Sequence, residues 1–135
     1  MITVLYLEDE PDQVEALSIL LNARGFNVIG KTDISEALHV VANQELNVVL
    51  MDMMMPPSDD IDPELVEYGR ETGIEVARRI KALKPELPIV ALTVVGDTSI
   101  RAKMLKAGII AIINKPSDVG PIVDQLNAVA RHIGH

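Results

Sequence analysis

Five polar residues of this sequence come directly after apolar runs, at positions where a buried strand would end. They are Glu8, Asp9, Asp52, Thr93 and Lys115. Asp52 follows the run Val-Val-Leu-Met, and a carboxylate at such a point must be solvated, hydrogen-bonded or placed against a cation. Taken alone, Thr93 is better explained as a β-branched strand residue. Lys115 could simply pair with Asp52 and hold it in place, which is compatible with a functional role. Taken together, the five residues predict a polar site.

The oxygen ligands of Glu8, Asp9 and Asp52 suit a hard divalent cation, and Mg²⁺ is the best match. Zinc is not expected, because the chain has no cysteine and its three histidines fall in predicted helices or at the C-terminus. Asp52 could then act as a nucleophile that accepts a phosphoryl group. Lys115 would offset charge on the transferred group, and Thr93 would offer it a hydrogen bond.

Apolar runs alternate with amphipathic stretches and predict the elements that must position these residues. Strands are expected at 2–7, 27–31, 48–51, 88–93 and 111–113, and helices at 11–24, about 33–43, 73–83, 97–106 and from 117 or 118 to about 132. The first helix is expected to carry Val14, Leu17, Leu20 and Leu21 on one face. This alternation indicates an α/β fold, with a parallel sheet covered by helices on both faces. Ligand sites in such sheets lie beyond the carboxyl ends of the strands, so the polar residues are expected to meet at one edge.

Length and composition limit the possible functions. The 135 residues are expected to form one domain, 1–135. The formal net charge of -8 and the presence of only three aromatic residues argue against a nucleic-acid partner. Neither a membrane-spanning stretch nor a signal peptide is recognised in the sequence. We therefore expect a cytoplasmic location and no membrane partner.

Residues 57–72 interrupt the alternation of elements. This segment holds six acidic residues and one arginine, so it contributes -5 of the net charge of -8. An extended acidic loop of this length is uncommon in a compact domain and is usually functional. Because it begins close to Asp52 in the sequence, it is expected to act as a lid or as an element that docks a partner.

The order and spacing of these motifs resemble a response-regulator receiver domain of two-component signalling, of the CheY-like superfamily, over nearly the whole chain. The resemblance rests on Glu8-Asp9, on Asp52 in the segment Asp-Met-Met-Met-Pro, on Thr93 and on Lys115-Pro116. It implies a flavodoxin-like, doubly wound five-stranded parallel sheet with strand order 2-1-3-4-5.

The resemblance also implies a role for each site residue. Asp52 would be the phosphoacceptor, and Mg²⁺ would be held by Glu8, Asp9, Asp52 and the main-chain carbonyl of Met54. Thr93 would be the switch hydroxyl, and Lys115 would contact the phosphate. The Lys115–Pro116 peptide bond would be cis, which proline permits.

The partners implied are a histidine kinase or phosphotransfer protein that donates the phosphoryl group and an unknown protein target that reads it. A homodimer through the fourth helix, fifth strand and last helix is a further possibility. The chain is expected to be a stand-alone receiver that signals through protein contact and is not an enzyme, apart from slow self-dephosphorylation.

Three positions depart from the family pattern. Ile112 stands where an aromatic switch residue is usual, Val94 where a small residue usually follows the switch hydroxyl, and Met54 places an apolar side chain two residues after the phosphoacceptor. Two alternatives stay open: a receiver-like adaptor that works without phosphorylation, and an aspartate-nucleophile phosphatase of the haloacid-dehalogenase type. The phosphatase would need an acid where Met54 stands.

Overall fold

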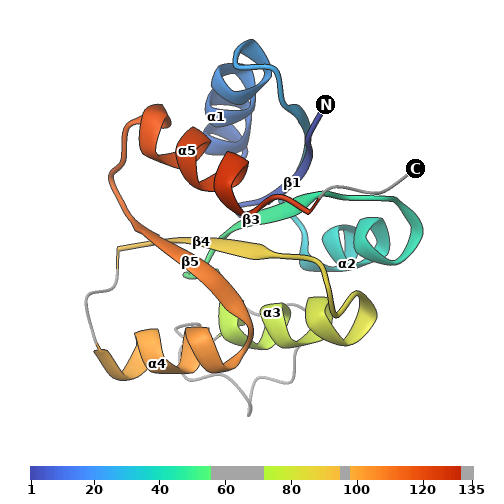
Figure 1. Cartoon of the computed structure of the whole chain (residues 1–135), viewed down its shortest axis with the longest axis vertical. Helices are drawn as coiled ribbons and strands as arrows, with labels where there is room; N and C mark the ends of the chain where they lie inside the picture. The colour runs from blue at the N-terminus through green and yellow to red at the C-terminus, as the bar shows by residue number, and fades with distance from the viewer. Residues whose placement is uncertain (56–71, 95–97, 132–135) are drawn as a thin grey trace.

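The computed structural model shows a five-stranded parallel sheet in the order β2-β1-β3-β4-β5, which confirms the predicted fold class and strand order (Figure 1). It describes residues 1–55, 72–94 and 98–131. The strands are β1 (Thr3–Leu7), β2 (Asn27–Lys31), β3 (Val48–Asp52), β4 (Ile89–Thr93) and β5 (Ile109–Asn114). The helices are α1 (Pro11–Ala23), α2 (Ile34–Asn43), α3 (Thr72–Leu83), α4 (Thr98–Lys106) and α5 (Val119–Val129).

Helices cover both faces of the sheet, with α1 and α5 on one face and α2, α3 and α4 on the other (Figure 1). Successive side chains of a strand point to opposite faces, so the central strands supply two separate cores. In β1, Val4 and Tyr6 belong to the core that contains Leu126 of α5, whereas Leu5 and Leu7 belong to the core shared with α2, α3 and α4. Central strands buried on both faces can carry charge only at their ends.

Two predicted boundaries differ from the structure at the C-terminal end of the chain. β5 is longer than predicted, because Ile109 already pairs with Ile89 of β4. α5 ends at Val129 rather than near residue 132. There the Arg131 N–H donates to the Asn47 carbonyl at 2.8 Å, and the Asn47 side chain donates to the Arg131 carbonyl at 2.6 Å. These bonds replace the hydrogen bonds that a further helical turn would make.

The apolar face of the first helix is unevenly buried. Leu21 is fully buried and Val14 and Leu17 are half-buried, but Leu20 is 49% exposed. Leu20 lies on the flank of the stripe formed by the other three residues, where the core does not cover it. The extended acidic loop predicted at 57–72 lies outside the described residues except for Thr72, the first residue of α3.

The start of α3 lies against the chain that leaves β3. A Cβ atom on Gly73 would sit 2.7 Å from the Met53 Cα atom and 2.8 Å from the Met53 carbonyl oxygen. These neighbours are backbone atoms, which cannot rotate away as a side chain can. The contact therefore requires glycine at position 73 and helps fix the segment that follows Asp52.

We expect Gly73→Ala to lower the free energy of unfolding by about 1–3 kcal/mol, because overpacking forces backbone to shift. Urea denaturation followed by circular dichroism measures the change. Gly120→Ala in α5 is the matched control, since a Cβ there meets nothing within 4 Å. Equal stabilities of the two variants would contradict the close approach of α3 to Met53.

Candidate functional site

The predicted site residues meet at the edge of the sheet where the parallel strands end. Glu8 and Asp9 follow β1, Asp52 ends β3, Thr93 ends β4 and Lys115 directly follows β5. Adjacent strands stay in register to this edge, since Asp52 pairs with Leu92 and Thr93 with Asn114. The fold thereby brings side chains as far apart in sequence as Glu8 and Lys115 into contact, as the sequence predicts.

The Lys115 ammonium lies between two carboxylates. Its Nζ atom is 3.0 Å from Glu8 Oε2 and 3.3 Å from Asp52 Oδ2. Burial alone would lower the pKa of Lys115, but the hydrogen bond with Glu8 and the charge of Asp52 outweigh burial and raise it. Lys115 is therefore a permanent cation beside the carboxylate predicted to act as nucleophile.

Glu8 is the most buried acid of the site, with 1% of its side chain exposed. Burial, together with hydrogen bonding to Asp52 and Asp9, raises the pKa of Glu8 to about 7, although the hydrogen bond from Lys115 opposes this shift. The Glu10 N–H donates to Glu8 Oε1 at 3.3 Å and helps fix the carboxylate. The local charge therefore favours either a proton or a cation at Glu8 near neutral pH.

The acidic cluster fits a hard divalent cation. One carboxylate oxygen from each of Glu8, Asp9 and Asp52 lies within 4.8 Å of the others. All the ligand atoms are oxygens, as Mg²⁺ prefers, and burial, followed by the neighbouring Asp52 and Asp9, raises the pKa of Glu8 despite the ammonium of Lys115. The Met54 N–H donates to Asp52 Oδ1 at 3.0 Å, which fixes the chain at the residue whose carbonyl is predicted to be a further ligand.

The three unusual positions lie around this site in different ways. Met54 and Val94 are exposed, by 38% and 66%, so both present apolar surface beside the strand ends. Ile112 is half-buried and packs against the core beneath α4.

Thr93 is fully buried, and its carbonyl accepts a hydrogen bond from the Lys115 N–H at 2.8 Å. The Lys115–Pro116 peptide bond is cis, as the resemblance implies.

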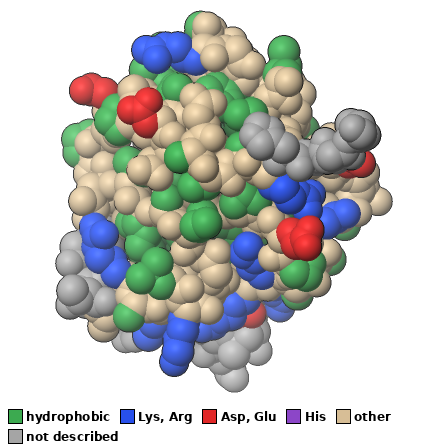
Figure 2. Space-filling model, viewed as in Figure 1, with side chains coloured by type: hydrophobic (Ala, Val, Ile, Leu, Met, Phe, Trp, Pro, Cys, Tyr) green, Lys and Arg blue, Asp and Glu red, His purple; other side chains and the backbone are tan. Residues whose placement is uncertain are grey.

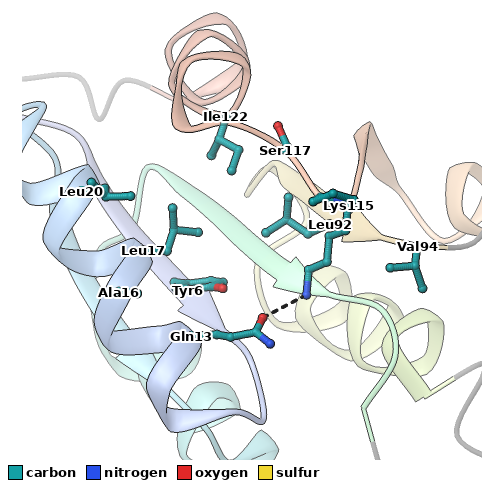
Figure 3. A pocket seen from close by; sticks show the side chains of 11 residues that line it. Tyr6, Gln13, Ala16, Leu17, Leu20, Leu92, Val94, Lys115, Ser117 and Ile122 are labelled. Carbon is teal, nitrogen blue, oxygen red and sulfur yellow. Dashed lines mark hydrogen bonds between the residues drawn. The ribbon is translucent and has the colours of Figure 1, made fainter.

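A groove of about 560 Å³ opens beside the site between α1 and α5 (Figure 3). Tyr6 and Leu92 lie beneath it, and Leu17, Leu20 and Ile122 form its apolar walls. At the end nearest the site, Gln13 of α1 accepts a hydrogen bond from Lys115 Nζ at 3.4 Å (Figure 3).

The sequence analysis did not single out Gln13. The available signal is its place in the first turn of a helix that begins right after the acidic pair, since this turn of α1 lies beside the strand ends.

Comparison with known proteins agrees with these features. A family model described as the response regulator receiver domain matches residues 4–127. The probable transcriptional regulatory protein TcrX of Mycobacterium tuberculosis is 29% identical over 133 residues, which cover 98% of this chain and 51% of TcrX. The phosphate regulon transcriptional regulatory protein PhoB of Pseudomonas aeruginosa is 28% identical over 134 residues, which cover 98% of this chain and 53% of PhoB. The chain thus spans about half the length of these curated relatives.

Solved structures show the same fold. The chemotaxis protein CheY4 of Vibrio cholerae superimposes with a TM-score of 0.81 at 21% identity, covering 96% of this chain and 98% of CheY4. A CheY-like receiver domain protein from Methanospirillum hungatei JF-1 gives a TM-score of 0.80 at 19% identity, and the match covers 95% of this chain and 92% of that protein.

Proposed function

The chain belongs to the family of response regulator receiver domains of two-component signalling, and we propose that it accepts a phosphoryl group on Asp52. The observation that carries this proposal is the placement of the Asp52 carboxylate between the Lys115 ammonium and the acidic pair Glu8-Asp9. Phosphoryl transfer needs mainly positioning and charge neutralisation, and this arrangement offers both.

In the proposed reaction, an Asp52 carboxylate oxygen attacks phosphorus and forms an acyl phosphate. The bond between phosphorus and the donor atom breaks, and its electron pair leaves with the donor. Lys115 contacts a phosphoryl oxygen and offsets its negative charge, while the Thr93 hydroxyl hydrogen-bonds another. In the later hydrolysis, a water oxygen bonds to phosphorus and its proton passes to solvent. The bond between phosphorus and the Asp52 oxygen breaks, which releases inorganic phosphate and restores the carboxylate.

We further propose that Glu8, Asp9, Asp52 and the Met54 carbonyl hold Mg²⁺ for this reaction. Receiver domains bind Mg²⁺ at their acidic pocket, and the oxygen ligands grouped in this chain suit that ion. When bound, the ion neutralises charge on the phosphoryl oxygens. Glu8 and Asp9 would position it, and Asp52 would contribute one oxygen while the other attacks.

The alternative of a phosphatase receives no support from the site. A second acid acting on the leaving group would have to stand at position 54, and Met54 offers only its backbone there.

Receiver domains act as phosphoacceptors, and a phosphorylation-independent adaptor would have no need for the full set of acids and lysine. We therefore retain only slow self-dephosphorylation as a catalytic activity of this chain.

The proposed phosphodonor is a histidine kinase or a phosphotransfer protein, since receiver domains interact with kinases and with downstream effectors. TcrX and PhoB are named as transcriptional regulatory proteins, and each is about twice as long as this chain. Three statements about this chain stay predictions from its sequence. They are that it works as a stand-alone receiver, that it is cytoplasmic and that it does not bind nucleic acid.

Among the described residues, no helix has the length and apolar character needed to cross a membrane.

We propose the face formed by α4, β5 and α5 as the surface that reads phosphorylation, through a partner or a second copy. Leu105 and Ile110 are each 58% exposed there. Figure 2 shows hydrophobic side chains over the middle of this face, with Lys and Arg side chains toward α4 and Asp or Glu side chains toward α5. α4 contributes Arg101, Lys103 and Lys106 and no acid, whereas α5 carries the exposed Asp124 and no base. An apolar centre with cations on its α4 side suits a partner that places acidic residues against α4.

A small phosphodonor such as an acyl phosphate, with Mg²⁺, should add one phosphoryl group to the protein, because Asp52 can react without a kinase. Intact-mass spectrometry detects the gain. Asp52→Asn should abolish it, whereas Asp124→Asn, an exposed acid of α5, should leave it unchanged. An unmodified protein, or one modified equally in the Asp52 variant, would defeat the assignment.

Mg²⁺ affinity should rise with pH through the region near neutrality. The pKa of Glu8 is raised to about 7, so below this pH a proton occupies the carboxylate and competes with the ion. The affinity should change by at most about tenfold per pH unit, with proton release detectable by calorimetry in two buffers. Glu8→Gln should bind the ion more weakly and with a flatter pH profile. A wild-type profile as flat as that of the variant would exclude Glu8 as the competing group.

Phosphorylation should shift the protein toward a dimer through the α4–β5–α5 face, which light scattering after chromatography would detect. Ile110→Lys should stay monomeric, because it places a charge at the apolar centre. Ile19→Lys on α1, also an exposed apolar residue, is the control and should behave as the wild type. A phosphorylated wild type that stays monomeric would leave this face to another partner and end the dimer proposal.

A further inference from the structure

The Lys115 ammonium has an acceptor for each of its three N–H donors. Besides Glu8 Oε2 at 3.0 Å and Asp52 Oδ2 at 3.3 Å, its Nζ atom reaches Gln13 Oε1 at 3.4 Å. An ammonium has three donors and no acceptor, so an additional oxygen can be bound only if one of these contacts is given up. The proposed reaction requires such an oxygen, that of the phosphoryl group.

The three acceptors differ in how readily they can be replaced. Glu8 is buried and makes the shortest of the three contacts, and the Glu10 N–H also holds its carboxyl group. Asp52 is the carboxylate proposed to react, and its contact with Lys115 is 3.3 Å long. Gln13 is neutral and exposed, and makes the longest of the three contacts. Hydrogen bonds between a cation and a neutral acceptor are weaker than those with a carboxylate.

We propose that Gln13 is a positioning residue that occupies the third donor of Lys115 in the unphosphorylated protein and is displaced by the phosphoryl oxygen. This inference rests on the proposed phosphorylation of Asp52. During attack the ammonium then contacts Glu8, Asp52 and the phosphoryl oxygen, and the Gln13 amide is released to solvent at the end of the groove between α1 and α5 (Figure 3).

Displacement of Gln13 predicts opposite effects for two substitutions of similar size. Gln13→Met removes the acceptor and frees the donor, so phosphoryl binding should improve. Gln13→Glu supplies a charged acceptor that competes more strongly, so phosphoryl binding should weaken. Each change should be about threefold to tenfold, the factor that corresponds to one modest hydrogen bond. A side chain with a merely structural role would give losses in both variants.

The experiment measures two quantities for the wild type, Gln13→Met and Gln13→Glu in the presence of Mg²⁺. The first is the affinity for beryllium fluoride, a non-covalent stand-in for the phosphoryl group. The second is the initial rate of phosphorylation by a small acyl phosphate. Ala23→Glu, which adds the same charge at an exposed position of α1 away from Lys115, is the control and should match the wild type. Thermal unfolding verifies that each variant is folded.

A third measurement follows the side-chain amide of Gln13 directly by nuclear magnetic resonance. Its signals should move toward those of a solvent-exposed glutamine when beryllium fluoride is added to the wild type. Affinities and rates in the order Met, Gln, Glu support the proposal. Equal values, the reverse order, or an amide signal that does not respond would overturn it. A wild type that neither binds the fluoride nor gains a phosphoryl group would instead refute the proposed function.

Discussion

The site is governed by one electrostatic constraint, the confinement of three carboxylates with one ammonium at the end of a parallel sheet. Lys115 lies within 3.3 Å of both Glu8 and Asp52, and Asp9 completes the acidic cluster. One positive charge against three negative charges leaves an imbalance, and burial makes that imbalance costly. The raised pKa of Glu8 expresses this cost. The same imbalance makes the site suited to a divalent cation, which would supply the missing positive charge.

The architecture explains why these charges gather where they do. β1, β3 and β4 are buried on both faces, so their interiors consist almost entirely of apolar side chains. A charged residue can then end or follow a strand but cannot sit in its middle, and the carboxyl ends of parallel strands lie at one edge of the sheet. The close approach of α3 at Gly73 and the hydrogen bond from the Met54 N–H hold the segment around Asp52 in place.

The fold class could be predicted from the alternation of apolar runs, and the set around Asp52 from the polar residues at the strand ends, because both depend on local pattern. Contacts that depend on packing could not be obtained in this way. Leu20 fits the apolar stripe of α1 but lies on its flank, and α5 ends early because Asn47 supplies hydrogen bonds from another part of the sheet. The place of Gln13 in the first turn of α1 brings it near the strand ends, but its contact with Lys115 depends on how α1 packs on the sheet.

The absence of an aromatic side chain at position 112 changes how the site is connected to α4. Ile112 packs half-buried against the core that Ile100 and Met104 of α4 share, and it has no polar tip to exchange between solvent and interior. A polar connection is nevertheless present, because Arg101 of α4 donates to Asn114 Oδ1 at 2.5 Å.

Asn114 directly precedes Lys115 and pairs with Thr93 across the sheet. Under the proposed function, a phosphoryl oxygen that replaces Gln13 would change the contacts of Lys115, and the hydrogen bond between Asn114 and Arg101 would offer a route from there to α4. On the opposite face of the sheet the same ammonium contacts α1 through Gln13. Lys115 and its neighbour Asn114 thus connect the candidate site to both helical layers.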